Sequence, residues 1–230
     1  MKKKLVVLSG AGISAESGIK TFRDSDGLWE GHNVNDVATP EGWARNPALV
    51  LDFYNQRRAQ LHTVKPNKAH EILVDLEQDF EVSIITQNVD NLHESAGSTN
   101  VLHLHGELFK VRSTLNHKYI LDWHTDLTFE DLDKNGNQLR PHIVWFGEQV
   151  PELENAVKIV QEADIVIVIG TSLQVYPAAS LMDFAPENIP VYYIDLKPAE
   201  VVNPPLNLKV IAAKASTGLE IIRKDLKKMI

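Results

Sequence analysis

Short apolar runs, each ending in glycine or polar residues, constrain the fold of this chain more than any other feature. Stretches with helical spacing separate them, such as Asn67 to Gln78 and Pro151 to Ala163. The runs are Leu5 to Leu8, Val82 to Ile85, Ile165 to Ile169 and Val191 to Ile194. Buried parallel strands that alternate with helices produce this pattern, so we predict an α/β fold built on a parallel sheet.

Ligands of such sheets bind beyond the carboxyl ends of the strands. We therefore expect the functional side chains in the segments that follow the apolar runs. These segments are residues 10–18, 86–93, 170–177 and 195–198.

Two stretches break the alternation and predict a smaller inserted module. Residues 21–61 mix glycine and proline with helical fragments, and residues 111–139 are polar and end in Asn135-Gly136-Asn137. A chain of 230 residues suits one principal core, so we expect residues 1–230 to form a single domain that carries both insertions.

Composition excludes several classes of protein. The chain has no cysteine, which rules out disulfides, thiolate nucleophiles and cysteine-bound zinc. A net charge of -8 argues against a nucleic-acid binder, and no apolar stretch approaches the roughly 20 residues that span a bilayer. The first apolar run is too short for a signal peptide, so we expect a cytoplasmic protein that is not bound to a membrane.

Gly10-Ala11-Gly12, together with Gly18, follows the first strand as a dinucleotide-binding turn would. Glycines let the backbone approach a pyrophosphate, and the start of a helix would add oriented N–H groups. The following Thr21-Phe22-Arg23 places a guanidinium beside the turn, where it can pair with phosphate oxygens. The alternatives are a plain tight turn and a surface arginine.

Residues 86–93 and a His-x-His-Gly segment carry polar side chains suited to catalysis. Asn88 and Asp90 alternate with Val89, so both can project into one pocket, although both types also favour turns and helix caps. Strand alternation puts His103 and His105 on one side, and a histidine can act as a general base near neutral pH. A structural histidine and a His-x-His metal pair are the alternatives.

Two further segments have the character of binding loops. Residues 141–148 combine an extended apolar stretch with two aromatics and a glycine, and they can pair with an extended peptide or pack in the core. Gly170-Thr171-Ser172 ends a strand with small hydroxyl residues, which either cap a helix or bind phosphate and ribose oxygens.

Taken in their order, these motifs resemble the signature of the sirtuin family. They are residues 10–19 with Thr21-Phe22-Arg23, residues 86–90, His105-Gly106 and Gly170-Thr171-Ser172, and the similarity runs from residue 5 to residue 222. The resemblance implies a Rossmann-like large domain, with NAD bound between it and the small module and an acyl-lysine of a protein threaded through the cleft. The implied activity is NAD-dependent protein-lysine deacylation, which yields nicotinamide, free lysine and O-acyl-ADP-ribose.

The resemblance also implies roles for individual residues. His105 would be the catalytic base that deprotonates a ribose hydroxyl, Asn88 and Gln87 would hold the ribose and a water, and Asp90 would hold the nicotinamide carboxamide. The implied NAD-binding residues are Gly10, Ala11, Gly12, Ser14, Glu16, Thr21, Phe22, Arg23, Trp29, Gln87, Asn88, Val89, Asp90, His105, Gly170, Thr171, Ser172, Asp195, Leu196, Lys197 and Ala215. The implied peptide-binding residues are Val144, Phe146, Gly147 and Glu148.

Asp195 stands where many sirtuins have an asparagine that contacts the adenosine ribose. A carboxylate still accepts from ribose hydroxyls but would oppose a 2′-phosphate, which favours NAD over NADP. Ala215 is the candidate for the last adenine contact.

A larger departure concerns zinc, which sirtuins usually hold with four cysteines in the small module. The corresponding interval, residues 112–140, has none, and neither its His and Asp residues nor the EF-hand-like start at residues 131–137 completes a metal site. The acidic and histidine candidates for a substitute site are His117, Asp122, His124, Asp126 and Asp131. We expect no metal, an Asn-Gly hairpin turn, and a module held by packing of Leu115, Leu121, Trp123 and Leu127.

Tyr54 and Arg57 match the Tyr-x-x-Arg pair of sirtuins that resemble desuccinylases and demalonylases. At helical spacing i and i+3 the two side chains share a face, so a phenol and a guanidinium can converge on a distal carboxylate. We therefore expect desuccinylase or demalonylase activity together with deacetylase activity. The structural alternative is an amphipathic helix with a core Tyr54 and a solvated Arg57.

Two other functions compete with deacylation. An ADP-ribosyltransferase or NAD hydrolase would use the same pocket without an acyl-lysine, and a non-enzymatic NAD sensor would not need His105. The sequence leaves the oligomeric state open.

Overall fold

The fold is organised around one six-stranded sheet in which every pairing is parallel. The computed structural model describes residues 2–20 and 28–230. Across the sheet, the strands are β5 (Val101–His103), β4 (Glu81–Thr86), β1 (Lys4–Ser9), β9 (Ile165–Ile169), β10 (Val191–Asp195) and β11 (Leu208–Ala212). This order is that of a Rossmann-like sheet, with the direction of winding reversed between β1 and β9, so the predicted fold class is confirmed.

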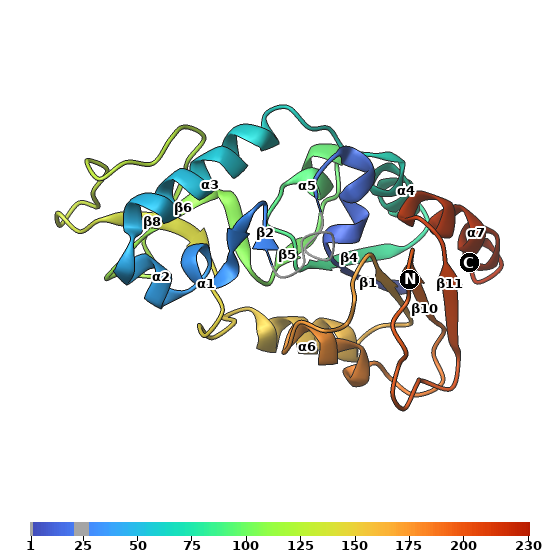
Figure 1. Cartoon of the computed structure of the whole chain (residues 1–230). Coiled ribbons are helices and arrows are strands. Elements are labelled where there is room, and N and C mark those ends of the chain that lie inside the picture. The colour runs from blue at the N-terminus through green and yellow to red at the C-terminus, as the bar shows by residue number, and fades with distance from the viewer. Residues whose placement is uncertain (1, 21–27) are drawn as a thin grey trace.

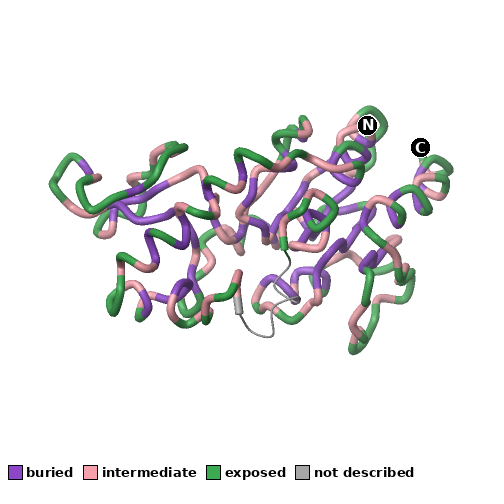
Figure 2. Tube along the Cα trace, turned by 45° about the horizontal axis from the view of Figure 1, so that its top comes forward, coloured by how far each residue is buried: buried purple, intermediate pink, exposed green. Residues whose placement is uncertain are grey.

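Helices cover both faces of the sheet, and alternate residues of β1 face opposite layers. Leu5 and Val7 pack against one layer, and Val6 and Leu8 pack against the other. The first layer contains α4 (Lys68–Leu76) and α7 (Ala215–Lys227), and the second contains α6 (Leu153–Gln161) and the 3-10 helix η4 (Ala178–Phe184). Figure 2 shows the buried residues concentrated along the strands and the inner sides of these helices. A central strand that is buried on both faces explains the unbroken apolar run that begins the chain.

Local sequence signals account for the helix starts near the site. Asn67 caps α4, where its side chain accepts from the N–H of Ala69 and His70 accepts from the Asn67 N–H. Asn46 caps α3 (Pro47–Leu61), where its side chain accepts from the Leu49 N–H, with proline at the first helical position. On α7 the buried Leu219, Ile222 and Leu226 recur at helical spacing.

The glycine turn after β1 differs from the prediction. The sequence predicts the start of an α-helix, whereas the chain forms two 3-10 turns, η1 (Ala11–Ile13) and η2 (Ala15–Ser17), and Gly18 ends the second at a φ of 92°. The sequence also did not predict β11, whose residues are half exposed at the edge of the sheet. A short, partly solvated edge strand lacks the apolar run that marks the central strands.

A second, smaller body lies to the left of the sheet in Figure 1 and is built from two segments, residues 28–61 and 106–143. Its helices and strands are α1 (Val34–Val37), α2 (Pro40–Arg45), α3, β2 (Leu28–Trp29), β3 (His32–Asn33), β6 (Gly106–Ser113), β7 (Ile120–Asp122) and β8 (Leu139–Ile143). β6 lies between β7 and β8 in an antiparallel sheet, and α3 packs on β6 and β8. α5 (Leu92–Ala96) follows β4 in the large part of the molecule.

Packing inside this small module agrees with the prediction except at one residue. Leu127 is buried, with Leu121 and Trp123 packed against the same cluster. Leu115, by contrast, is 78% exposed, so its predicted packing role is wrong. Leu115 lies in the connection between β6 and β7, where the side chain reaches no neighbouring layer.

Asp133 holds the hairpin turn of the module by hydrogen bonds. Its carboxylate accepts from the Ser113 hydroxyl at 2.6 Å and from the N–H groups of Asn135 and Asn137. These hydrogen bonds, led by the one from Ser113, hold the pKa of Asp133 well below its usual range. The chain reverses at Gly136, whose φ is 82°, as an Asn-Gly turn requires.

A buried ion pair joins β6, β8 and the segment that follows β8. Glu148 accepts from Arg112 at 3.0 Å and from Arg140 at 2.7 Å, and both arginines are 5% exposed. The same carboxylate accepts from the N–H of Trp145 at 2.8 Å. The two arginines and Glu148 therefore connect β6 and β8 with the segment that follows them.

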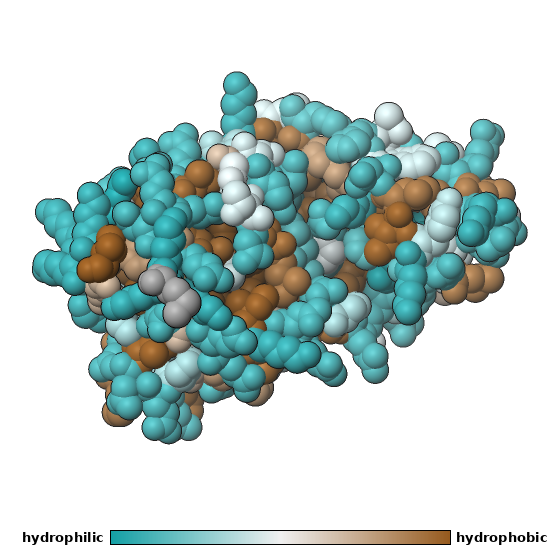
Figure 3. Space-filling model, turned by 180° about the vertical axis from the view of Figure 1, so that it is seen from behind, coloured by the Kyte–Doolittle hydropathy of each residue, from teal (hydrophilic) through white to brown (hydrophobic). Residues whose placement is uncertain are grey.

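The surface supplies two further observations. No helix in the described residues is long and apolar enough to cross a membrane. Seen from behind, the molecule presents mostly hydrophilic side chains, with apolar ones in separate groups (Figure 3). Scattered exposed apolar residues of this kind are ordinary on a protein surface.

Glu148→Ala tests the ion pair. The substitution leaves Arg112 and Arg140 buried without their carboxylate, which costs about 3 kcal/mol or more of the free energy of unfolding. Urea denaturation followed by circular dichroism measures this loss. The matched control is Glu130→Ala, because Glu130 is exposed in the same module; an equal effect of the two substitutions would contradict the role of the pair.

Candidate functional site

The loops that follow β1 and β9 meet at the point where the sheet reverses its winding. Gly10 N–H donates to the Ile169 carbonyl at 3.0 Å, and Gly12 N–H donates to the Gly170 carbonyl at 2.8 Å. A Cβ on Gly12 would lie 2.7 Å from the Gly170 Cα, and Gly170 itself has a φ of 64°. Glycine is therefore required here for contact between two loops, in addition to any approach of a ligand.

Beside this contact, Ser14 joins the two polar side chains that follow β4. Its hydroxyl donates to Asp90 at 2.9 Å and accepts from the Asn88 amide at 3.1 Å. All three residues are buried, and Asp90 also accepts from the Leu92 N–H. Burial raises the pKa of Asp90, in opposition to its two hydrogen bonds. Ser14, Asn88 and Asp90, which we call the polar cluster, thus come together as the strand-end prediction expects.

The two histidines of the His-x-His-Gly segment face the loop that follows β4. His105 Nδ1 lies 3.1 Å from the Gln87 carbonyl, and His103 Nδ1 lies 3.0 Å from the Asn88 carbonyl. A carbonyl only accepts, so each Nδ1 carries the proton and the His105 Nε2 is left with a lone pair. Burial lowers the pKa of His105, partly offset by the Gln87 contact, which favours the neutral imidazole.

His103 differs from His105 because its second nitrogen contacts a carboxylate. His103 Nε2 lies 2.7 Å from Glu94 on α5. Burial would lower the pKa of His103, but the hydrogen bond and charge of Glu94 outweigh it and raise the pKa. His103 and Glu94 therefore support the backbone of Asn88, whereas His105 keeps a free nitrogen for chemistry.

The Gln87 side chain connects this loop with the loop after β9. Its amide donates to the Thr171 hydroxyl at 3.2 Å, and that hydroxyl also accepts from the Leu173 N–H. Thr171 is buried, and Ser172 beside it is half-buried. Gln87 and Thr171 therefore lie at the same edge of the sheet as the polar cluster.

The remaining candidate NAD contacts lie towards the β10 and α7 side. Asp195 is buried and accepts from the Lys197 N–H at 2.8 Å, whereas Leu196 between them is 61% exposed. Ala215 is buried at the start of α7. Glu16 accepts from the N–H and hydroxyl of Ser216, so its carboxylate caps α7 and ties the glycine loop to that helix.

Backbone hydrogen bonds to residues outside it hold the segment that is predicted to bind a peptide. Val144 N–H donates to the His105 carbonyl at 2.9 Å, and Phe146 N–H donates to the Ala38 carbonyl at 3.0 Å. Gly147 is exposed, and Phe146 is 47% exposed. Glu148 uses its carboxylate in the buried ion pair, so its structural contacts support this segment and do not reach outward.

Tyr54 and Arg57 lie on α3, where Tyr54 is fully buried and Arg57 is half-buried. Tyr54 Oη accepts from the Trp145 indole N–H at 3.0 Å, and burial raises the pKa of Tyr54. The Arg57 guanidinium lies 5.2 Å from the Phe53 ring centre and has no hydrogen-bond or ion-pair partner among the described residues. Trp29 packs edge-on against Phe53 and Tyr54, so it lies near the predicted acyl pair.

Three predicted candidates lie outside the described residues, and one residue that fixes the glycine loop was not predicted. Thr21, Phe22 and Arg23 lie outside the described residues. The sequence prediction missed Asn67, whose side chain donates to the Ile13 carbonyl at 2.8 Å and to Ser17, and thereby fixes the glycine loop. The sequence indicates that Asn67 is a helix cap. Its contact with the Ile13 carbonyl joins residues that are 54 positions apart, which the sequence does not indicate.

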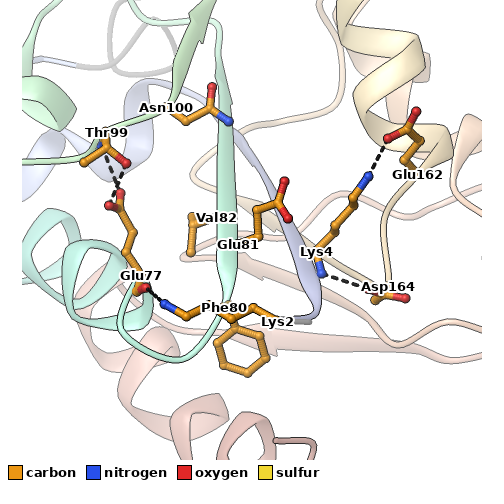
Figure 4. A pocket seen from close by; sticks show the side chains of 10 residues that line it. All are labelled: Lys2, Lys4, Glu77, Phe80, Glu81, Val82, Thr99, Asn100, Glu162 and Asp164. Carbon is orange, nitrogen blue, oxygen red and sulfur yellow. Dashed lines mark hydrogen bonds and ion pairs between the residues drawn. The ribbon is translucent and has the colours of Figure 1, made fainter.

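A surface pocket lies at the opposite edge of the sheet, at the amino ends of β1 and β4 (Figure 4). Lys4 pairs there with Glu162, and Lys2 donates to the Glu77 carbonyl at 2.7 Å. This exposed ion pair is part of the pocket lining, which contains none of the strand-end motifs. We therefore place the functional site at the carboxyl edge and not here.

A metal site finds no support in the part of the chain that the structure describes. No group of three or more His, Cys, Asp or Glu side chains in residues 2–20 and 28–230 is arranged to hold an ion. His103 Nε2 lies 2.7 Å from the Glu94 carboxylate, so it is not free to share a metal ion with His105.

The site thus combines a reversal point of a parallel sheet, a glycine loop, a buried polar cluster and a neutral histidine. These features define a Rossmann-like protein with a binding crevice at its switch point and a candidate base beside it. Residues 10–177 match the model of the Sir2 family, and the chain belongs to this family, as its resemblance to sirtuins predicts.

Relatives and solved structures agree with this assignment. The chain is 56% identical over 227 residues to an NAD-dependent protein deacylase of Helicobacter pylori, with 99% of each chain covered. It is 53% identical over 228 residues to an NAD-dependent protein deacylase of Bacteroides thetaiotaomicron, covering 96% of this chain and 97% of that one. A solved complex of a Sir2 homologue with NAD superposes with a TM-score of 0.86 at 38% identity, covering 99% of this chain and 91% of that one.

Gly12→Ala tests the contact between the two loops. The added Cβ would meet only backbone atoms of Gly170, so the loops must separate, and overpacking of this kind costs about 1 to 3 kcal/mol. Thermal or urea unfolding measures the loss. Gly18→Asn is the matched control, because nothing lies within 4 Å of its Cβ position and asparagine tolerates the left-handed conformation; equal losses would contradict the proposed crowding.

Proposed function

We propose that this protein is an NAD-dependent protein-lysine deacylase, which converts an acylated lysine and NAD to free lysine, nicotinamide and O-acyl-ADP-ribose. The observation that carries the proposal is the neutral His105, with a free Nε2, beside the polar cluster at the switch point of the sheet. The names of the relatives, and a Sir2 protein solved with an acetylated peptide at a TM-score of 0.79 and 25% identity, support the same activity.

NAD fits the residues present at this edge. The contact of Gly12 with Gly170 leaves the glycine loop close to the sheet, as a pyrophosphate site requires, and Thr171 and Asp195 offer oxygen atoms for ribose hydroxyls. Asp90 and Asn88 would hold the nicotinamide end, because they are buried polar side chains that a carboxamide can partner. When bound, NAD supplies an electrophilic ribose carbon once nicotinamide leaves.

His105 would take a proton from a ribose hydroxyl at its Nε2 atom. The Gln87 carbonyl holds the Nδ1 proton and fixes the ring, so the lone pair stays on the opposite nitrogen. His103 and Glu94 keep the Asn88 backbone in place beside it. The peptide would lie along residues 144–147, where Phe146 and Gly147 are exposed.

We further propose that the enzyme accepts acidic acyl groups, with desuccinylase or demalonylase activity beside deacetylase activity. Arg57 supports this, because its guanidinium has no ionic partner among the described residues and lies one helical turn from Tyr54. A charge-assisted hydrogen bond to a distal carboxylate contributes about 1.5 to 3 kcal/mol, which is enough to change selectivity tenfold. The cytoplasmic location expected from the sequence stays a prediction.

The pH dependence of deacylation tests His105 as the base. The active form is the neutral imidazole, which is present above the pKa of His105 and lost below it. Because burial lowers this pKa, the acid limb of kcat/KM should be centred below pH 6.5. His103→Gln is the control, since it removes the other imidazole of this segment; an acid limb centred above pH 6.5 in both proteins would contradict the assignment.

A panel of acetyl, succinyl, malonyl and glutaryl peptides with NAD tests the reaction and the acyl preference together. Mass spectrometry should detect the matching O-acyl-ADP-ribose, and Arg57→Met should lower desuccinylation at least tenfold while changing deacetylation much less. Arg45→Met is the control, because it removes an exposed guanidinium from the same module. Nicotinamide release without any acyl peptide would instead favour an NAD hydrolase or ADP-ribosyltransferase.

A further inference from the structure

The indole of Trp145 makes a contact that neither the family motifs nor the proposed chemistry uses. Its N–H donates to the hydroxyl oxygen of Tyr54 at 3.0 Å, across 91 residues of sequence. Trp145 is 2% exposed and Tyr54 is fully buried, so water does not compete for this bond. The bond joins the predicted peptide-binding segment to the helix that carries the predicted acyl pair.

A phenol hydroxyl has one proton and two acceptor positions. Its O–H bond lies near the plane of the ring and points in one of two directions. A donor that approaches on one side of the oxygen forces the proton to the other side. The Trp145 indole therefore fixes the direction in which Tyr54 can donate.

Tyr54 has no acceptor for that proton among the described residues. The neighbouring Arg57 likewise has a buried Nε–H without a partner, and its guanidinium lies over Phe53. Leaving buried donors unused costs free energy, and these two lie at i and i+3 on one helix, where a single carboxylate can accept from both. Burial also keeps the Tyr54 phenol protonated, because it raises the pKa.

Trp145 itself is held firmly enough to orient another side chain. The Arg140 guanidinium lies 3.3 Å from its ring centre, and the Trp145 backbone N–H donates to Glu148 at 2.8 Å. Trp43 packs against the indole at 5.8 Å between ring centres. The buried ion pair of the small module thus fixes the backbone and the ring face of Trp145, and its remaining polar atom is directed at Tyr54.

We propose that Trp145 is a positioning residue for acyl selectivity: its indole N–H orients the Tyr54 hydroxyl so that the phenol donates to the distal carboxylate of an acidic acyl group beside Arg57. This inference rests on the proposed preference for acidic acyl groups and extends it to a residue outside the Tyr-x-x-Arg pair. It also gives the small module a part in selectivity through Arg140 and Glu148.

Trp145→Phe removes the indole N–H and keeps an aromatic ring. The ratio of kcat/KM for a succinyl peptide to that for the matched acetyl peptide should fall about fivefold, the value of one ordinary hydrogen bond. Replacing Trp145 by benzothienylalanine, in which sulfur stands in place of the N–H, should give the same fall with the ring shape preserved. This second variant decides the question if Trp145→Phe folds poorly.

Tyr54→Phe completes a double-mutant cycle. Tyr54→Phe alone should lower the succinyl-to-acetyl ratio, and adding Trp145→Phe should lower it no further, because Trp145 acts only through the Tyr54 hydroxyl. Additive losses, or equal losses for both acyl groups with the benzothienylalanine variant, would show that Trp145 acts only by packing and would overturn the proposal.

Substitutions at Tyr54 and Arg57 separate the acyl preference from the role of Trp145. If Tyr54→Phe and Arg57→Met leave the ratio unchanged, the acidic-acyl preference is wrong and the role of Trp145 fails with it. If those two substitutions lower the ratio and both changes at Trp145 do not, the acyl preference stands and only the role of Trp145 is overturned.

Discussion

The backbone contact between the glycine loop and Gly170 is the constraint on which the rest of the site depends. It brings the loops after β1 and β9 together where the sheet reverses its winding, and it requires that Gly12 and Gly170 lack a Cβ. With that contact in place, Ser14 lies within reach of Asn88 and Asp90. Asn67 at the start of α4 and Ser216 on α7 secure the same loop, so three separate elements hold a segment that forms only short 3-10 turns. The site is therefore built on rigid packing, although its residues lie on loops.

The small module is tied together by hydrogen bonds and ion pairs and contains no cysteine. The Asp133 carboxylate accepts hydrogen bonds from four groups around one turn: one of Ser113, one of Asn135 and two of Asn137. Glu148 pairs with two buried arginines. Such polar contacts stabilise a structure only when nearly every donor and acceptor is matched, because unmatched buried charges are costly. The ion pair also has a consequence beyond stability, since it holds Trp145 against Tyr54 and so connects the module to the predicted acyl pocket.

Histidines show how one residue type takes different roles at short spacing. His103 and His105 both direct Nδ1 to successive carbonyls of the loop after β4, but only His103 has a carboxylate at its other nitrogen. Glu94 raises the pKa of His103, whereas burial lowers that of His105. Opposite shifts two residues apart therefore separate a supporting histidine from one that is neutral and able to accept a proton.

Much of this protein was determined by its sequence alone. The buried apolar runs predicted four of the six strands of the parallel sheet to within a residue at each end, and the order of the strand-end motifs predicted the family, because both signals are local in sequence. The absence of cysteine excluded the usual zinc site directly. The tertiary structure decided which partners the polar side chains take. The sequence predicted that Glu148 binds the peptide substrate, whereas its carboxylate pairs with Arg112 and Arg140. The tertiary structure also left Leu115 exposed, although the sequence predicted that it packs in the module. Asn67 and Trp145 likewise gain their roles from atoms 54 and 91 residues away. Pairing over such separations depends on how two insertions pack against each other, and no local pattern of residues encodes that geometry.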